Sequence, residues 1–258
     1  MTRECRFCRA PLEITMVDLG MSPLSNAFLG QDRLNAMEKF YPLRVYACGK
    51  CFLVQLEEFE SPEHVFSDYV YFSSYSDSWL AHCQRFARRM IDELQLGSGS
   101  SVIELASNDG YLLQYFAAAG VPVLGVEPAA NVARVAQEKG IPSRVMFFGR
   151  ETADALRQEG YRADLLIGNN VYAHVPDISG FTAGMARILA PQGVISLEFP
   201  HLCDLIAQNQ FDTIYHEHFS YLSLLAVEQI FGAHGLRVYA VERLPTHGGS
   251  LRVFGCHK

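Results

Sequence analysis

Four cysteines occur in two pairs near the N-terminus, Cys5 with Cys8 and Cys48 with Cys51, and two residues separate the members of each pair. Each pair can form a tight turn that presents two thiolates to one ion. Two such turns complete the tetrahedral sulfur site of a structural zinc, with no position left open for a substrate. Four buried free thiols or a redox dithiol are the alternatives, but a redox pair usually belongs to a strand–helix unit, and neither pair does.

Two carboxylates are expected to mark the ends of neighbouring strands. Glu104 starts the loop 104–110, and Glu127 follows the apolar run 123–126. A carboxylate at the second position can accept both ribose hydroxyls of an adenosine. The loop lacks GxGxxG, and Asp109 would repel a pyrophosphate, so the pattern disfavours a dinucleotide. S-adenosylmethionine has no phosphate and carries positive charge, which suits an acidic loop; solvated loop tips are the alternative.

The polar pair Asn169-Asn170 follows another apolar run, so it is expected at the same edge of the sheet. Small residues in the first loop would let the backbone approach a ligand closely. The candidate cofactor-binding residues are therefore Glu104, Ala106, Ser107, Asn108, Asp109, Gly110, Glu127, Pro128, Asn169 and Asn170.

The elements that must position these residues alternate between strands and helices after a polar hinge at 97–101. This order implies a parallel sheet covered by helices on both faces, with ligands bound beyond the carboxyl ends of its strands. The fold class is therefore α/β, with a Rossmann-like sheet and a small N-terminal zinc-binding domain. Strands are predicted at 102–105, 123–126, 163–167, 194–197 and 251–254, and helices at 80–96, 111–119, 130–139 and 178–189.

Composition and charge exclude several classes of protein. The 258 residues are 49% apolar and 19% charged, with a net charge of -7, and no basic run suggests nucleic-acid binding. No apolar stretch reaches the roughly 18–20 residues that span a bilayer, and the N-terminus lacks the apolar core of a signal peptide. We expect a cytoplasmic protein with a small-molecule substrate and no nucleic-acid or membrane partner; nothing indicates its oligomeric state.

Several segments occur in the order typical of one known family. The chain resembles the zinc-containing sugar C-methyltransferases, which alkylate a carbon next to the ketone of nucleotide-linked 4-keto-deoxysugars. The resemblance implies a class I methyltransferase sheet, S-adenosylmethionine, structural zinc and a nucleotide-linked sugar. After the cysteine pairs, the segments that carry it are Tyr69–Ser74, Glu104–Gly110, Asn169–His174, Tyr215–Tyr221 and Gly248–Val253.

The resemblance also implies catalytic roles. Removing a proton from a carbon next to a ketone takes a positioned base, with a pKa near working pH, and groups that stabilise the enolate oxygen. By resemblance His218 is the base, and Tyr215 and Glu217 orient the sugar or the base. His174 and Tyr71 would line the same pocket and bind the ketone oxygen.

Other interpretations of these residues stay open. His216 and His218 would share one face of an extended segment and could ligate a metal. The Tyr215–His218 residues could also be ordinary loop residues, His174 a satisfied structural histidine, and Tyr71 a packing aromatic. Ala106 replaces a glycine common in the family, which leaves a non-catalytic zinc-containing binding module as an alternative.

The chain is expected to divide into a zinc-binding domain at 1–62, a connector and helix lining the active site at 63–98, and a methyltransferase domain at 99–258. Family members usually continue past Gly248–Val253 into another α/β domain that helps hold the nucleotide. This chain ends at Lys258, so that substrate domain is expected to be absent. A methyltransferase acting on a non-sugar carbonyl intermediate is the resulting alternative.

Overall fold

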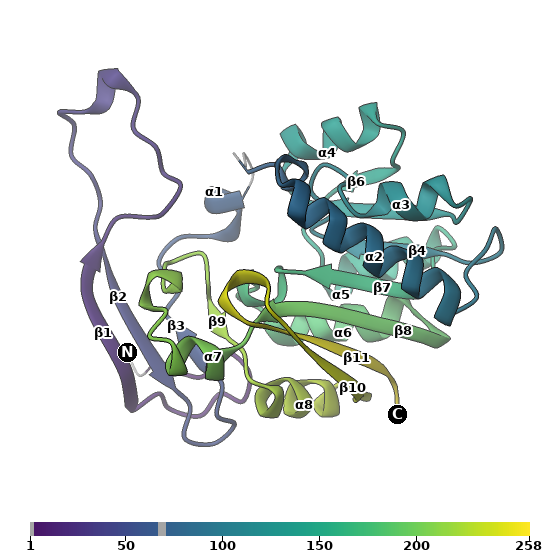
Figure 1. The fold of residues 1–258 in the computed structure, drawn as a ribbon. Helices are drawn as coiled ribbons and strands as arrows, with labels where there is room; N and C mark the ends of the chain where they lie inside the picture. The colour runs from purple at the N-terminus through teal and green to yellow at the C-terminus, as the bar shows by residue number, and fades with distance from the viewer. Residues whose placement is uncertain (1–2, 67–70) are drawn as a thin grey trace.

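A computed structural model describes residues 3–66 and 71–258 of the chain. These residues form one sheet of four strands and one of seven (Figure 1). Tyr69 and Val70, which belong to one of the family-like segments, lie outside the described residues. No helix within the described ranges has the length and apolar character needed to cross a membrane.

The larger sheet has the strand order β10-β11-β8-β7-β4-β5-β6. Its strands β4 to β8 pair in parallel, whereas β11 runs antiparallel to both of its neighbours. This sheet confirms the predicted Rossmann-like α/β class. The strands are β4 (Val102–Leu105), β5 (Val123–Glu127), β6 (Ser143–Val145), β7 (Ala163–Asn169), β8 (Leu189–Pro200), β10 (Leu236–Leu244) and β11 (Ser250–His257).

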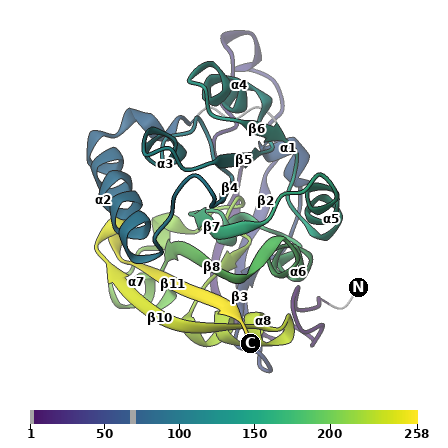
Figure 2. The same ribbon diagram turned by 90° about the vertical axis from the view of Figure 1, so that its right-hand side faces the viewer.

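Helices cover both faces of this sheet because its buried strands are apolar on both sides. In β4, Val102 packs in one core with α2 and α3, whereas Ile103 and Leu105 pack in the other with α5, α6 and α8. Figure 2 shows the two helical layers on either side of the strands. The helices are α2 (Asp77–Glu93), α3 (Leu113–Ala118), α4 (Ala130–Glu138), α5 (Arg150–Gln158), α6 (Ile178–Ile188) and α8 (Leu224–Ala233).

Helix α2 begins at Asp77, slightly before the predicted range of 80–96. The reason is local: the Oγ atom of Ser76 accepts a hydrogen bond from the N–H of Trp79 at 3.3 Å and so caps the helix. This cap places Trp79 in the first turn. Four helices were not predicted from the sequence: α5 and α8, and the shorter α1 (Pro62–Phe66) and α7 (Leu202–Ala207).

The smaller sheet joins the N-terminal head to a distant part of the chain. Strands β1 (Ile14–Ser22), β2 (Tyr41–Ala47) and β3 (Val54–Leu56) are followed at the sheet edge by β9 (Ser220–Tyr221). Val54 pairs with Tyr221 and Gln55 with Ser220. The segment that carries His218 therefore runs directly into the sheet of the cysteine-containing head.

Candidate functional site

The four paired cysteines converge at one point of the head. Their Sγ atoms all lie within 4.8 Å of one another. The Sγ atoms of Cys5 and Cys51 are 3.5 Å apart, as are those of Cys8 and Cys48. Tetrahedral zinc with Zn–S bonds of about 2.3 Å holds its sulfur ligands roughly 3.8 Å apart, so the cluster has the dimensions of a zinc site. In the described part of the chain it is the one cluster of potential metal ligands.

The two cysteine pairs also have matching backbone geometry. The residues that follow them, Arg9 and Phe52, have φ of 61° and 59°. Each of their N–H groups donates to the carbonyl of the first cysteine of its pair, Cys5 or Cys48, at 3.0 Å. Two identical turns facing each other fit one zinc ion, and the filled set of four ligands fits a structural role.

A cavity of about 660 Å³ lies at the carboxyl ends of the parallel strands. It brings together residues from the connector, from the strand ends and from the Tyr215–His218 segment. The predicted site residues that line it are Tyr71, Ala106, Asn108, Glu127, Pro128, Asn169, Asn170, His174, Tyr215 and His218. The predicted residues outside its lining are Glu104, Ser107, Asp109, Gly110 and Glu217.

Glu127 ends β5 with its carboxylate held in place by backbone. Its Oε2 accepts the N–H of Asn108 and its Oε1 the N–H of Ala129, both at 2.9 Å. Burial raises its pKa, and these two hydrogen bonds oppose that rise. Each oxygen still has a free lone pair, because a carboxylate can accept about four hydrogen bonds. The fixed carboxylate is therefore suited to two vicinal hydroxyls of a ribose.

The loop after β4 is folded by unusual backbone angles. Ala106, Asn108 and Gly110 have φ of 54°, 50° and 77°. These left-handed residues delay the following helix, so α3 begins at Leu113 and not at residue 111 as predicted. A left-handed alanine is strained, because its Cβ approaches the following carbonyl.

Asn108 and Asp109 hold the connector as well as the loop, and of these two residues Asn108 lines the cavity whereas Asp109 does not. The side chain of Asn108 donates to the carbonyl of Tyr71 at 3.0 Å and accepts from the N–H of Ser73 at 2.9 Å. Asp109 pairs with Lys139 at 3.0 Å and lies outside the cavity. The connector is thereby fixed beside the cavity, where Tyr71 and Ser73 line it.

Three other residues of the loop face the protein interior and not the cavity. Glu104 is fully buried, and burial raises its pKa well above the ordinary value. Ser107 is also fully buried, and its hydroxyl lies where a side chain at Gly125 would be. A Cβ on Gly110 would meet Ile141 at 3.0 Å. These residues shape the loop from below and do not face the cavity.

The cavity wall carries the features that S-adenosylmethionine needs. Asn169 is buried at the cavity wall, and the Oδ1 atom of Asn170 is buried without a hydrogen-bond partner in the described structure. Buried polar groups are nearly always hydrogen-bonded, so these amides are suited to a polar ligand. Another part of the cavity wall is apolar. It is formed by Met146–Phe148, a segment beyond β6 that was not predicted from the sequence. An apolar wall beside Glu127 fits the adenine of a nucleoside whose ribose that carboxylate binds.

His218 is held in one tautomer. Its Nδ1 lies 2.8 Å from the carbonyl of Thr213, and its Nε2 lies 3.0 Å from the hydroxyl of Tyr215. A carbonyl only accepts, so Nδ1 carries the hydrogen and Nε2 accepts the hydroxyl of Tyr215. Burial lowers the pKa of His218 to about 4, and burial raises that of Tyr215 to about 12. The pair therefore presents a neutral imidazole and a neutral phenol at the cavity.

The remaining predicted catalytic residues have different surroundings. His174 lies with its ring centre 4.6 Å from that of His218, and burial holds its pKa well below the ordinary value. Tyr71 is half-exposed at the cavity wall. Glu217 differs from the expectation that it orients sugar or base directly: its Oε1 accepts from Asn26 at 2.8 Å and from Ser25 at 3.2 Å. It thereby fixes Asn26, which does line the cavity.

The alternative of a metal bound by His216 and His218 finds no support in the described structure. His216 Nε2 lies 3.2 Å from the carbonyl of Pro42, and its ring packs against Tyr41 and Phe59. The segment turns between the two histidines, since the N–H of His218 donates to the carbonyl of Tyr215. The two imidazoles therefore have separate partners.

Comparison with known proteins gives two family matches that together span most of the chain. Residues 5–66 match a zinc binding domain, and residues 79–241 match a methyltransferase domain. The C-methyltransferase NovU of Streptomyces niveus is 37% identical over 251 residues, which cover 97% of this chain. The chain spans 60% of the length of that relative. An ubiquinone biosynthesis O-methyltransferase of Chelativorans sp. is 30% identical over 98 residues, 38% of this chain and 39% of the relative.

Solved structures agree on the fold. Magnesium protoporphyrin IX methyltransferase from Synechocystis with bound SAH superposes with a TM-score of 0.54 over 69% of this chain and 83% of that one, at 17% identity. At that identity the likeness concerns the fold alone. The expected methyltransferase family and fold are thus confirmed.

Proposed function

The chain belongs to the methyltransferase domain family, with a zinc binding domain ahead of it, and from that premise we propose that it is an S-adenosylmethionine-dependent C-methyltransferase. The observation that carries the proposal is the position of His218 and Tyr215 in the cavity that Glu127 also lines. A proton acceptor and a nucleoside-binding carboxylate thus face one space. The 37% identical C-methyltransferase supports transfer to carbon.

We propose that the acceptor is a nucleotide-linked keto-deoxysugar and that His218 removes the proton next to its ketone. Bound S-adenosylmethionine supplies the electrophilic methyl group. Nε2 of His218 has a free lone pair once the Tyr215 hydroxyl turns toward the acceptor, so it can take the proton from carbon. The imidazolium formed in this buried place is stabilised by the adjacent enolate charge. The released hydroxyl of Tyr215 can donate to the enolate oxygen.

His174 and Tyr71 supply further polar groups around the same carbonyl in this proposal. His174 stays neutral because burial opposes its charged form, so it can hydrogen-bond the ketone without repelling the imidazolium of His218. Glu217 acts indirectly through Asn26. The proposed cofactor-binding set keeps Glu127, Pro128, Asn169, Asn170, Ala106 and Asn108, which line the cavity.

We retain the division at residues 62 and 98 as a proposal, with the head acting on the site through contacts. Arg6, inside the first cysteine pair, donates to the carbonyl of Pro176 at 3.0 Å, and Pro176 lines the cavity. Strand β9 and the Asn26–Glu217 hydrogen bond are the other links. Zinc in the head would therefore stabilise the geometry of the cavity without contacting the cofactor or the acceptor.

The test combines calorimetry with labelled methyl transfer. We expect S-adenosylmethionine and S-adenosylhomocysteine to bind, and the label to move to carbon in a panel of nucleoside-diphosphate 4-keto-deoxysugars. Transfer only to non-sugar ketones would replace the sugar by another carbonyl acceptor. A folded, zinc-loaded protein that binds neither cofactor would favour a non-catalytic binding module.

A further inference from the structure

His247 is a residue of the cavity that the catalytic proposal leaves without a role. It lies in the turn Thr246–Gly248 between β10 and β11, and its side chain lines the cavity with His218. Its backbone has φ 51° and ψ 40°, inside the left-handed region. That conformation is unfavourable for an L-residue, because its Cβ lies too close to the following carbonyl oxygen. Strain of this kind persists only where the surrounding structure holds it, and it often marks functional positions.

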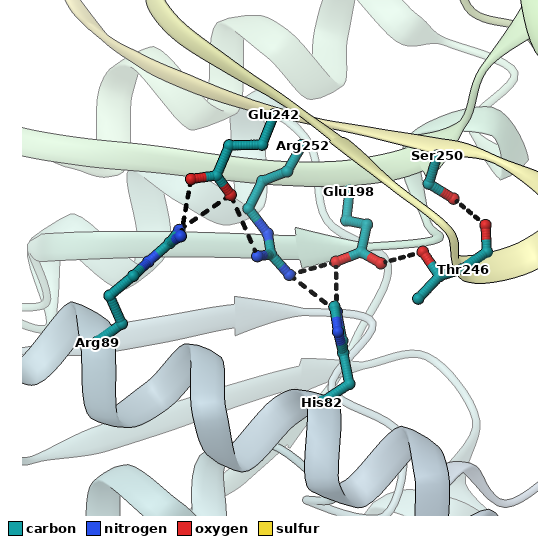
Figure 3. Close-up of polar contacts among 7 residues, drawn as sticks. All are labelled: His82, Arg89, Glu198, Glu242, Thr246, Ser250 and Arg252. Carbon is teal, nitrogen blue, oxygen red and sulfur yellow. Dashed lines mark hydrogen bonds and ion pairs between the residues drawn. The ribbon is translucent and has the colours of Figure 1, made fainter.

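The turn is held from below by a buried carboxylate. Thr246 Oγ1 donates to Glu198 Oε1 at 2.8 Å, and Ser250 Oγ donates to the carbonyl of Thr246 at 2.9 Å, as Figure 3 shows. On its other side the turn is held by Gln210, whose Nε2 donates to the carbonyl of Gly248 at 2.7 Å. The position of His247 is therefore fixed by bonds to both of its neighbours.

Glu198 belongs to a network that joins four elements, α2, β8, β10 and β11 (Figure 3). Its side chain is fully buried, forms an ion pair with Arg252, and lies 2.9 Å from Nε2 of His82. Burial opposes its charge, but the hydrogen bond from His82 and the charge of Arg252 outweigh burial, so its pKa is lowered. Arg252 also reaches Glu242, which Arg89 of α2 binds at 2.7 Å. The charged carboxylate beneath the turn is thus locked in place.

The ring of His247 is packed on one side and open on another. It meets Trp79 edge-on at 5.3 Å between ring centres, and Trp79 stacks on His82 at 5.0 Å. The imidazole forms no hydrogen bond with any residue that the structure describes, although it faces the cavity. It also lies close enough to His218 to contribute to the lowered pKa of that residue. A fixed imidazole with free ring nitrogens can bind a ligand.

The sheet order decides which ligand is within reach. The turn lies at the start of β11, which is four strands away from β5, the strand that ends at Glu127. At about 4.8 Å between strands, the turn is laterally about 19 Å from the carboxylate proposed to hold the ribose. The nucleoside therefore occupies the far end of the cavity, and the His218 end is left for the acceptor.

We propose that His247 binds the acceptor, through a hydrogen bond between its imidazole and an oxygen substituent near the reacting carbon. The residue is a positioning group for the substrate and takes no part in proton removal. The proposal rests on the proposed function, because it requires an oxygenated acceptor beside His218.

The variants follow from the backbone angles. His247→Gly removes the imidazole and tolerates the positive φ, whereas His247→Asn keeps a polar side chain in a conformation that asparagine accepts. His234→Asn, at the end of α8 outside the cavity lining, is the matched control. Binding is measured without turnover, by titrating the S-adenosylhomocysteine complex with the nucleoside-diphosphate 4-keto-deoxysugar panel in a calorimeter.

We expect His247→Gly to weaken acceptor binding at least about tenfold, the loss of roughly one hydrogen bond, with S-adenosylhomocysteine affinity unchanged. His247→Asn should recover part of the lost acceptor affinity. The control His234→Asn should show no loss of acceptor affinity. Equal acceptor binding by wild type and His247→Gly overturns the proposal, as does an equal loss of cofactor affinity. Acceptor binding without methyl transfer overturns the proposed function alone, and a complex that binds no member of the panel overturns both.

Discussion

Gln55 of the cysteine-containing head pairs with Ser220, two residues beyond His218, across the edge of the smaller sheet. The side chain of the same Gln55 donates to the Sγ atom of Cys5 at 3.2 Å. One residue thus touches the proposed zinc cluster through its side chain and the active-site segment through its backbone. This contact makes the consequences of metal loss predictable.

Zinc removal should destabilise the head and disturb catalysis through β9. We expect one zinc per chain, and we expect Cys8→Ser or a strong chelator to lower the unfolding temperature. Because Glu127 belongs to the other sheet, methyl transfer should fall more than S-adenosylhomocysteine affinity. Metal analysis, thermal unfolding and calorimetry measure these effects.

The control is Cys203→Ser, because Cys203 is exposed and lies outside the cluster. A full equivalent of zinc bound by Cys8→Ser would contradict the assignment of Cys8 as a zinc ligand.

Replacing the proposed base should separate chemistry from binding. We expect His218→Gln to reduce the rate of methyl transfer about 10²–10⁴-fold, the usual contribution of a general base. S-adenosylhomocysteine affinity should stay within about twofold, since its proposed contacts lie elsewhere. Tyr215→Phe should cause a smaller loss of rate. Single-turnover kinetics with labelled cofactor measure both, and a wild-type rate in His218→Gln would exclude this residue as the base.

The pH dependence of kcat/KM should reflect the lowered pKa of His218. A base must be unprotonated, so activity is present above its folded pKa and is lost as pH falls through about 4. The acidic limb should therefore lie far below the ordinary histidine value. The free energy of unfolding should also fall as pH falls, because the unfolded chain, with its ordinary histidine pKa, takes up the proton first. Unfolding must be followed in parallel, and an acidic limb near pH 6.5 in folded protein would refute the assignment.

Removing the carboxylate of Glu127 should weaken cofactor binding. Glu127→Ala takes away the proposed acceptor of the ribose hydroxyls and leaves the N–H groups of Asn108 and Ala129 without their partner. We expect the dissociation constant of S-adenosylhomocysteine to rise about 10- to 100-fold, as for loss of hydrogen bonds to a charged group. Calorimetry measures it beside Glu151→Ala, an exposed control on α5. Unchanged affinity would place the nucleoside elsewhere.

Relieving the backbone at Ala106 should stabilise the protein. Ala106→Gly removes the strain of φ 54°, and the greater freedom of glycine in the unfolded chain offsets part of the gain. We expect the free energy of unfolding to rise by about 0.5–1 kcal/mol. Denaturant titration checks this against Ala130→Gly in the first turn of α4, where glycine should destabilise. A less stable Ala106→Gly would show that the alanine side chain contributes packing that outweighs its strain.

Local patterns in the sequence predicted the zinc ligands and the sheet. The spacing of Cys5–Cys8 and Cys48–Cys51 constrains each pair to a tight turn, and apolar runs ending in Glu127 and Asn169 constrain the strands. The Tyr215–His218 segment was recognised by resemblance, and the residue types alone did not distinguish the roles of its individual residues. Such features depend on residues that are close together in the chain, so the sequence alone is enough to predict them.

The tertiary structure decided which of those side chains face one cavity. It turned Glu217 toward Asn26, 191 positions away, and buried Glu104 and Ser107 below the loop. It fixed the tautomer of His218 through the carbonyl of Thr213, and it brought in Met146–Phe148 and His247, which no motif indicated. Residue types state what a side chain can donate or accept, but its partner depends on how distant elements pack.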